Sequence, residues 1–286
     1  MPDKSVSMRF SLIMATHGRT EELERFLSAL DVQTHTNFEL IVVDQNPDER
    51  LRPLLAPYED RFEILRMRSK KGLSRARNAG LEGISGDIVA FPDDDCHYPP
   101  DLLERVARFL SEHPELDGLC GRSVDRYGRN SNMRFDPESG FIDRFNVWRR
   151  AISYTIFLRA ESTRKTRFDE QLGLGAGTMW GSAEETDYVL WVLYHQGASL
   201  YYDQSLFVNH SQPTERRDAK TMRRRAYCYN YGIGHVLRKH HYPLTFMVRS
   251  LYPHLRGVAL SLARLKRSRA RQSWSAFKGR LRGLLS

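Results

Sequence analysis

The chain has 286 residues, of which 41% are hydrophobic and 28% charged, with 44 Lys and Arg against 35 Asp and Glu. This length fits one large or two modest domains with a real core, and the composition excludes wholesale disorder and fibrous repeats. No run approaches the roughly 18 apolar residues of a membrane-spanning helix. The three cysteines are far apart and match neither a disulfide framework nor a metal-ligand pattern, so we expect a cytosolic protein.

Strand-like and helix-like segments alternate through the first 121 residues. Apolar runs predict strands at Phe10–Ala15, Phe38–Val43, Phe62–Met67, Ile88–Phe91 and Leu116–Gly121. Helical spacing predicts a helix after Thr20, the expected N-cap, and two more over Leu73–Ile84 and Asp101–Leu110. This alternation predicts an α/β fold with a mostly parallel, Rossmann-like sheet flanked by helices.

The second half of the chain is less regular. Residues 122–168 are basic and irregular, with one candidate strand at Ile152–Leu158. A helix is expected to open at Ala183, and a strand over Leu200–Val208 is expected to end at Asn209 and His210. A glycine run at 173–177 superficially suggests dinucleotide binding, but no strand precedes it, and we discount that interpretation.

The C-terminal part carries a very different charge from the rest. From Ala219 on, 68 residues hold 16 Lys and Arg and no Asp or Glu. We therefore predict a catalytic domain over 1–215 and a basic helical extension over 216–286. Its apolar residues recur at spacings of three and four among the basic ones, as in Leu251, Leu255, Val258, Leu262 and Leu265, and later in Trp274, Phe277, Leu281 and Leu284.

This amphipathic pattern has three interpretations. An anionic bilayer surface is the favoured partner, because each nearby Lys or Arg adds about 1 kcal/mol of attraction. The alternative is a helix packed on its own domain with a solvated charged face. Nucleic acid ranks well below the membrane, because no recognition motif accompanies the basic residues.

Polar residues cluster where the predicted strands end. Thr16, Asp44 and the run Asp93, Asp94 and Asp95 all occupy such ends, which is where ligands gather in parallel α/β sheets. Adjacent carboxylates repel one another unless a cation neutralises them. Mg²⁺ or Mn²⁺ is the natural partner, and such ions commonly bridge to substrate phosphates. The alternative is a solvated acidic turn.

A second acidic cluster opens the predicted helix near residue 184. Glu184, Glu185 and Asp187 are favoured there by the helix dipole alone, and a carboxylate in a pocket can also act as a general base. His210 is a candidate metal ligand or base at a strand end, although a lone histidine is more often neither.

Four ordered motifs together resemble glycosyltransferase family 2 over residues 8 to 210. They are Ser11-Leu12-Ile13-Met14-Ala15-Thr16-His17-Gly18-Arg19 with Val42-Val43-Asp44, Gly72-Leu73-Ser74-Arg75-Ala76-Arg77-Asn78, Phe91-Pro92-Asp93-Asp94-Asp95, and Trp180-Gly181-Ser182-Ala183-Glu184-Glu185-Thr186-Asp187. The resemblance implies the glycosyltransferase A fold and an inverting, metal-dependent transfer from a nucleoside-diphosphate sugar. The basic tail lies outside it.

The resemblance also implies roles for individual residues. Thr16, Asp44, Arg77, Asp93 and Asp94 would bind the nucleotide sugar. Asp95 and His210 would bind Mn²⁺ or Mg²⁺, Glu185 with Glu184 beside it would supply the catalytic base, and Trp180, Gly181 and Asp187 would line the acceptor side.

These features together give an expected function. We expect a glycosyltransferase that acts on a saccharide carried by a polyprenyl diphosphate, in surface or extracellular polysaccharide synthesis. It would be cytoplasmic and peripheral on the inner face of the membrane, with no nucleic-acid partner. The alternatives are a nucleotidyltransferase, or a non-catalytic membrane- or nucleic-acid-binding protein on the same fold.

Overall fold

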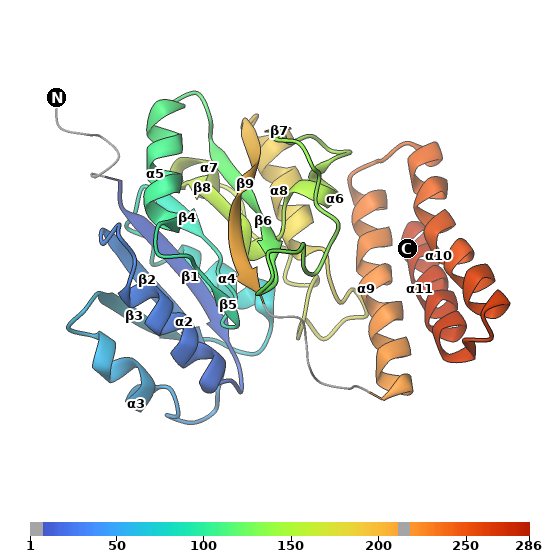
Figure 1. Ribbon diagram of the computed structural model, residues 1–286, viewed down its shortest axis with the longest axis horizontal. Helices are drawn as coiled ribbons and strands as arrows, with labels where there is room; N and C mark the ends of the chain where they lie inside the picture. Colours follow the sequence, from blue (N-terminus) through green and yellow to red (C-terminus); the bar gives the residue numbers. More distant parts are fainter. Residues whose placement is uncertain (1–7, 211–217) are drawn as a thin grey trace. The chain divides into compact units, whose positions relative to one another are not determined.

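The computed structural model describes residues 8–210 and 218–286 (Figure 1). Their contacts form two compact units, which we describe separately. Among the described residues, the first unit comprises 8–71, 75–167 and 188–210, and the second comprises 72–74, 168–187 and 218–286. The predicted domain boundary at residues 215 and 216 lies outside the described residues.

A mixed sheet organises the first unit. Its strands are β1 (Phe10–Thr16), β2 (Phe38–Asp44), β3 (Glu63–Arg68), β4 (Ile88–Ala90), β5 (Cys96–His97), β6 (Gly118–Val124), β7 (Gly140–Phe141), β8 (Ile156–Arg159) and β9 (Leu200–His210). They are ordered β3-β2-β1-β4-β8-β6-β9-β5, and β7 pairs with β9. Within the described part of the chain, β5, β7 and β8 run against the other strands. The sheet is therefore mostly parallel, as predicted.

Helices cover the sheet and complete this unit. They are α2 (Glu21–Asp31), α3 (Arg52–Leu55), η1 (Ala56–Tyr58), α4 (Leu73–Leu81), α5 (Leu102–Glu112), α6 (Val147–Arg150), η2 (Ser153–Thr155), α7 (Ala160–Thr163) and α8 (Glu184–His195), of which α4 and α8 each begin in the second unit. The apolar faces of α2 and α5 pack on Phe10, Leu12 and Met14 of β1 (Figure 1). On the opposite face Ile13 lies against Gly80 of α4, where a larger residue would clash.

Most predicted elements are present, with shifted ends. The helix predicted over Leu73–Ile84 stops at Leu81. Thr20 occupies the N-cap position of α2, but its side chain makes no capping hydrogen bond. Its backbone carbonyl accepts from Glu24 N, as in any helix start. In the candidate strand Ile152–Leu158, residues 153–155 instead form a 3-10 turn, and β8 begins at Ile156.

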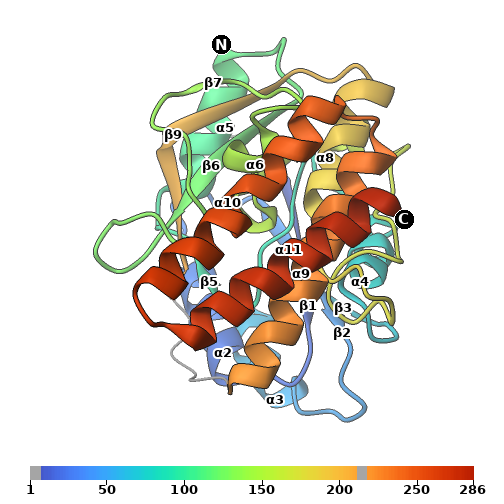
Figure 2. The same ribbon diagram turned by 90° about the vertical axis from the view of Figure 1, so that its right-hand side faces the viewer.

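Three helices dominate the second unit, α9 (Ala219–Lys239), α10 (Leu244–Ala263) and α11 (Arg267–Leu285) (Figure 2). Asp218 caps α9 by accepting from the backbone N–H groups of Lys220 and Thr221 at 2.8 and 3.0 Å. The apolar stripe predicted through Leu265 is broken, because Leu265 takes a φ of +54° in the turn between α10 and α11. No helix among the described residues combines the length and apolar character that crossing a bilayer requires.

Candidate active site

The triple aspartate lies beside the carboxyl end of β1. The chain leaves β4 at Ala90, and Asp93 then forms a single parallel bridge with Ala15. Thr16 and Asp44 are partners in the parallel register of β1 and β2. The structure thus gathers the polar residues that end these strands at one edge of the sheet.

Asp95 and His210 meet through the pairing of β5 with β9. Cys96 is the register partner of His210, so the preceding residue brings its carboxylate to the imidazole, with Oδ1 3.1 Å from Nε2. The ring of Tyr154 stacks on His210 with centroids 4.9 Å apart, which fixes the plane of the imidazole. Strand pairing and stacking together orient this histidine.

Asp93, Asp95 and His210 form a cluster with donor atoms suited to a divalent cation. Each offers one ligand atom, and the three atoms lie within 4.8 Å of one another. Burial alone would raise the pKa of Asp95, but the hydrogen bond and charge of His210 and the charge of Arg19 hold it below its usual range. Asp95 is therefore ionised at neutral pH. Two carboxylate oxygens and an imidazole nitrogen fit Mn²⁺ or Mg²⁺.

Asp94 points into a different environment from its two neighbours. It is 5% exposed, its Oδ2 accepts from Thr16 Oγ1 at 2.7 Å, and its Oδ1 contacts Arg19. Burial raises its pKa to about 6, against the opposing effects of Arg19 and Thr16. Arg19 also lies 2.8 Å from Asp95, so one guanidinium bridges two of the three carboxylates.

Both carboxylate oxygens of Asp44 are occupied by protein groups. Oδ1 accepts from the backbone and side-chain nitrogens of Asn46, each at 2.8 Å. Oδ2 accepts from Arg66 at 2.7 and 3.1 Å and lies 3.4 Å from Arg68. Asp44 is fully buried, and burial would raise its pKa, but these hydrogen bonds hold it below the usual range.

Arg77 is buried behind the acidic run. It is 1% exposed on α4, and its Nη2 donates to Asp93 Oδ1 at 3.2 Å. A buried guanidinium with this partner fixes the Asp93 carboxylate from within the protein.

In the second unit, the Trp180-Gly181 segment packs along α9. The Trp180 ring stacks on His235 with centroids 3.8 Å apart and a 15° interplanar angle. Gly181 N donates to Cys228 O at 3.1 Å, and Ser182 Oγ donates to Tyr229 O at 2.8 Å. The loop before α8 is therefore held by side-chain stacking and by the α9 backbone.

The three acidic residues that open α8 have different surroundings. Glu184 is 6% exposed, and its carboxylate lies against Gly173, where an added Cβ would come within 2.9 Å of it. Glu185 is partly exposed. Asp187 is fully buried and accepts from Lys239 Nζ at 2.9 Å and lies 2.8 Å from His240 Nε2.

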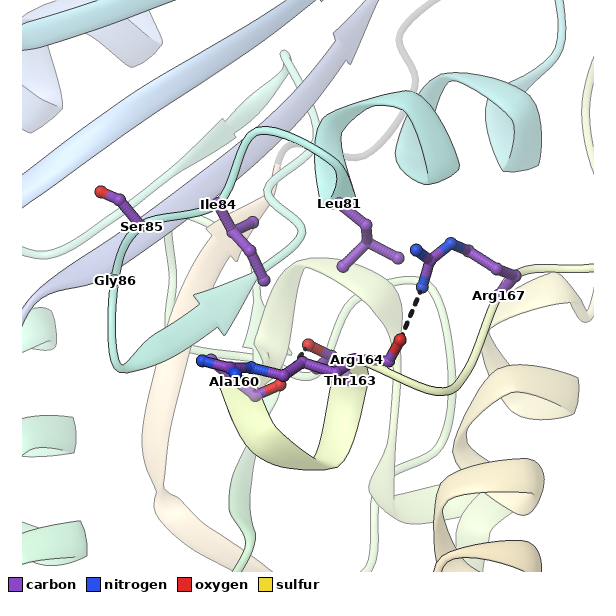
Figure 3. Close-up of a pocket in the computed structure, with 8 residues that line it drawn as sticks. All are labelled: Leu81, Ile84, Ser85, Gly86, Ala160, Thr163, Arg164 and Arg167. Carbon is purple, nitrogen blue, oxygen red and sulfur yellow. Dashed lines mark hydrogen bonds between the residues drawn. The ribbon is translucent and has the colours of Figure 1, made fainter.

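A pocket with two arginines in its lining lies at the other end of β4 (Figure 3). Its volume is about 170 Å³, and its lining includes Gly86, just before β4, and Arg164 and Arg167 near α7. Arg167 donates to Arg164 O at 3.2 Å and to Glu82 at 2.6 Å. This pocket lies at the amino end of the strand, away from the acidic run that follows the carboxyl end.

Comparison with known proteins identifies the family. The model described as Glycosyl transferase family 2 matches residues 11–183. The chain belongs to glycosyl transferase family 2. Among curated relatives, this family 2 chain is 27% identical to the amylovoran biosynthesis glycosyltransferase AmsE of Erwinia amylovora over 143 residues, which are 48% of this chain and 54% of AmsE. In three further curated relatives, the region that matches this chain covers only 36%, 41% and 46% of the relative's own length.

Solved structures show the same fold. The mannosyltransferase PcManGT from Pyrobaculum calidifontis, in complex with GDP-Man and Mn²⁺, aligns with a TM-score of 0.65 at 16% identity, covering 97% of this chain and 87% of that one. S. aureus TarS 1-349, in complex with UDP-GlcNAc, aligns with a TM-score of 0.60 at 18% identity, covering 96% and 91%. The family 2 chain therefore has the glycosyltransferase A fold with C-terminal helices.

Several residues that hold the predicted site residues of the two units in place were not singled out by sequence reasoning. They include Arg19, Arg66, Tyr154, Lys239 and His240. Arg19 had a usable signal, since it follows Thr16 within the first motif. Lys239 and His240 had none, because no acidic residue stands near them in the sequence to indicate a partner.

Proposed function

We propose that this family 2 chain transfers a sugar from a nucleoside-diphosphate sugar to a hydroxyl of a saccharide acceptor, with inversion at the anomeric carbon. The observation that carries the proposal is the cluster of Asp93, Asp95 and His210 at the carboxyl ends of the strands. PcManGT with GDP-Man and Mn²⁺ and TarS with UDP-GlcNAc support a donor of this class.

The donor side is assigned to the first unit. Asp95 and His210, with Asp93 beside them, would hold Mn²⁺ or Mg²⁺, which when bound neutralises charge on the departing diphosphate. Asp93 would also contact the ribose or base, and Arg77 keeps its carboxylate in place. Thr16, Asp44 and Asp94 would complete the nucleotide site. Thr16 donates to Asp94, Arg19 contacts Asp94 and Arg66 contacts Asp44, and these contacts restrict the side chains.

The acceptor side is assigned to the segment that opens α8. Glu185 takes the proton from the attacking hydroxyl, because it is the partly exposed member of its pair while Glu184 is buried against Gly173. The hydroxyl then attacks from the face opposite the leaving diphosphate, so an α-linked donor gives a β-linked product. Trp180 and Gly181 line the acceptor side, and Asp187 holds the helix start through Lys239.

We assign the acceptor to the cytoplasmic face of the membrane. A saccharide on a polyprenyl diphosphate would suit an enzyme that binds this surface peripherally, in polysaccharide synthesis of the kind that the name of AmsE describes. One face of α10 supports this placement. It exposes a row of apolar residues at helical spacing, Leu244, Val248, Tyr252, Leu255 and Leu262, and the helix contains no acidic residue.

A thermal-shift panel tests the proposal. UDP, GDP, dTDP and CDP are each added with and without Mn²⁺. We expect one nucleotide to raise the melting temperature only when the metal is present, and its sugar conjugate to release that nucleoside diphosphate when acceptor is supplied. Release of inorganic diphosphate instead would indicate a nucleotidyltransferase, and no shift with any nucleotide would contradict the donor assignment.

A further inference from the structure

A cavity of about 520 Å³ lies among the three C-terminal helices, in the second unit. Each helix contributes one face to it. The side chains that can donate hydrogen bonds include Arg225 and Asn230 from α9, His254 and Ser261 from α10, and Arg269 and Ser273 from α11. Its size matches that of small-molecule sites in proteins, roughly 300–1,000 Å³.

Two of the three helices that line the cavity, α9 and α11, have their positive ends on the same side. Gly279 and Gly283 of α11 lie against the backbones of Tyr227 and Tyr231 of α9, so residue numbers rise in the same direction along both helices. The helices are therefore parallel. The N-terminal halves of α9 and α11 supply most of the cavity lining, so the partial positive charges of both N-termini lie on the same side of the unit. The third helix, α10, contributes His254 and Ser261 from its C-terminal half.

The charge of the cavity is not balanced by any nearby acidic residue of these helices. The chain has no Asp or Glu after residue 218, and none lines the cavity. Arg225 is held by Tyr229, whose hydroxyl accepts from Nη2 at 2.8 Å and whose ring lies under the guanidinium. A fixed arginine in a lining without carboxylates favours an anion.

A partly buried arginine next to the cavity, Arg280, adds to this positive charge. Arg280 donates to Asn230 Oδ1 at 2.8 Å, while its Nε is buried without a hydrogen-bond partner among the described residues. Burial lowers the pKa of Arg280 to about 10, which leaves it charged at neutral pH. Burial, with the charge of Arg280, lowers the pKa of His254 to about 4, so this ring is a neutral hydrogen-bonding group.

We propose that this cavity binds a phosphate or diphosphate group, supplied by the headgroup of a membrane lipid. Paired arginines and hydroxyl donors recognise phosphate oxygens well, because guanidinium groups bind them in a bidentate manner. The choice of a lipid rests on the proposed function and on the exposed apolar row of α10, where Leu244 and Tyr252 are 74% and 65% exposed. That row would contact the acyl region while the cavity holds the headgroup.

Arg269→Gln tests the site, with Arg271→Gln as matched control. Both arginines are exposed on α11 and both changes remove one charge, but only Arg269 lines the cavity. Binding is measured by flotation with vesicles of phosphatidylcholine alone or mixed with phosphatidylglycerol. General attraction of about 1 kcal/mol per basic residue allows about a fivefold loss for R271Q, whereas we expect R269Q to lose more than tenfold on the anionic vesicles only. Equal losses would overturn the proposal.

A second experiment distinguishes a lipid headgroup from a soluble phosphate compound as the ligand of the cavity. Inorganic diphosphate is titrated into the full chain by calorimetry in EDTA, so that no metal loads the donor site. Arg269-dependent binding of diphosphate without Arg269-dependent flotation would overturn the lipid assignment, and loss of flotation with R269Q supports it. The metal-dependent rise in melting temperature with nucleotide, measured on R269Q, should be unchanged. A failure of the donor assignment would therefore be distinguishable from a failure of the lipid site.

Discussion

The imidazole of His210 lies 3.1 Å from the carboxylate of Asp95, although the two residues are 115 positions apart in the sequence. The contact follows from the antiparallel pairing of β5 with β9, in which Cys96 is opposite His210. Asp93 completes the group, so a two-residue strand determines whether a cation site exists here. Four predictions test this site and the packing that supports the chain.

Replacement of the proposed base should separate binding from turnover. In Glu185→Gln, we expect nucleotide affinity to be unchanged and turnover to fall by about 10²–10⁴-fold, the usual contribution of general base catalysis. Nucleoside diphosphate release and calorimetry measure the two quantities. Glu170→Gln is the control, since Glu170 is exposed in the same unit. Normal turnover in E185Q would exclude Glu185 as the base.

Asp95→Asn should weaken nucleotide binding only when metal is present. The change removes a charged oxygen ligand but keeps the shape of the side chain, so the metal-free nucleotide affinity should stay the same. A calorimetric titration of nucleotide with Mn²⁺, and again in EDTA, measures both states. Asp60→Asn, an exposed position in the same unit, is the control. An identical Mn²⁺ dependence in D95N and the parent chain would remove Asp95 from the ligand set.

Loss of Lys239 should destabilise the protein strongly. Lys239 neutralises the fully buried Asp187 and also lies 2.8 Å from Asp169. Removing one partner of a buried ion pair leaves the other charge buried, at a cost of about 3 kcal/mol or more. We expect Lys239→Met to lower the free energy of unfolding in urea by that amount, and Asp187→Asn in the same chain to restore part of it.

The comparison for this variant is Lys278→Met, which removes an exposed lysine from α11. Surface charges of this kind contribute about 0–1 kcal/mol. If the two lysine variants unfolded at the same urea concentration, the Asp187 pair would have no special role in stability.

Two glycines of the C-terminal helices should respond in opposite ways to alanine. A Cβ on Gly279 would collide with the backbone carbonyl of Tyr227, which cannot rotate away, whereas a Cβ on Gly257 would meet only the side chain of Ser273, whose hydroxyl can rotate away. Alanine favours a helix over glycine by about 1 kcal/mol, while overpacking costs about 1–3 kcal/mol. Thermal unfolding should show a lower melting temperature for Gly279→Ala and an equal or higher one for Gly257→Ala. A rise for both would contradict the close packing of α9 and α11.

The local pattern of the sequence predicts the strands and helices that frame the donor side. Leu40, Ile41, Val42 and Val43 are all buried because a parallel strand covered on both faces needs apolar side chains throughout. The same rule places Thr16, Asp44 and Asp93 at strand ends, since polar residues appear where the covered stretch stops. These features depend on neighbours in sequence, so the sequence pattern alone is enough to predict them.

Contacts between residues far apart in the sequence could not be predicted from the sequence pattern, and the tertiary structure alone determines them. Lys239 and His240 belong to a segment without acidic residues, and only the fold of the second unit brings Asp187 to them. Arg280 belongs to a helix for which the sequence predicts an apolar stripe and a cationic face, yet Gly279 and Gly283 let α11 approach α9 so closely that the Nε of Arg280 is buried. Such contacts depend on backbones meeting across large sequence separations, and composition and periodicity carry no information about that distance.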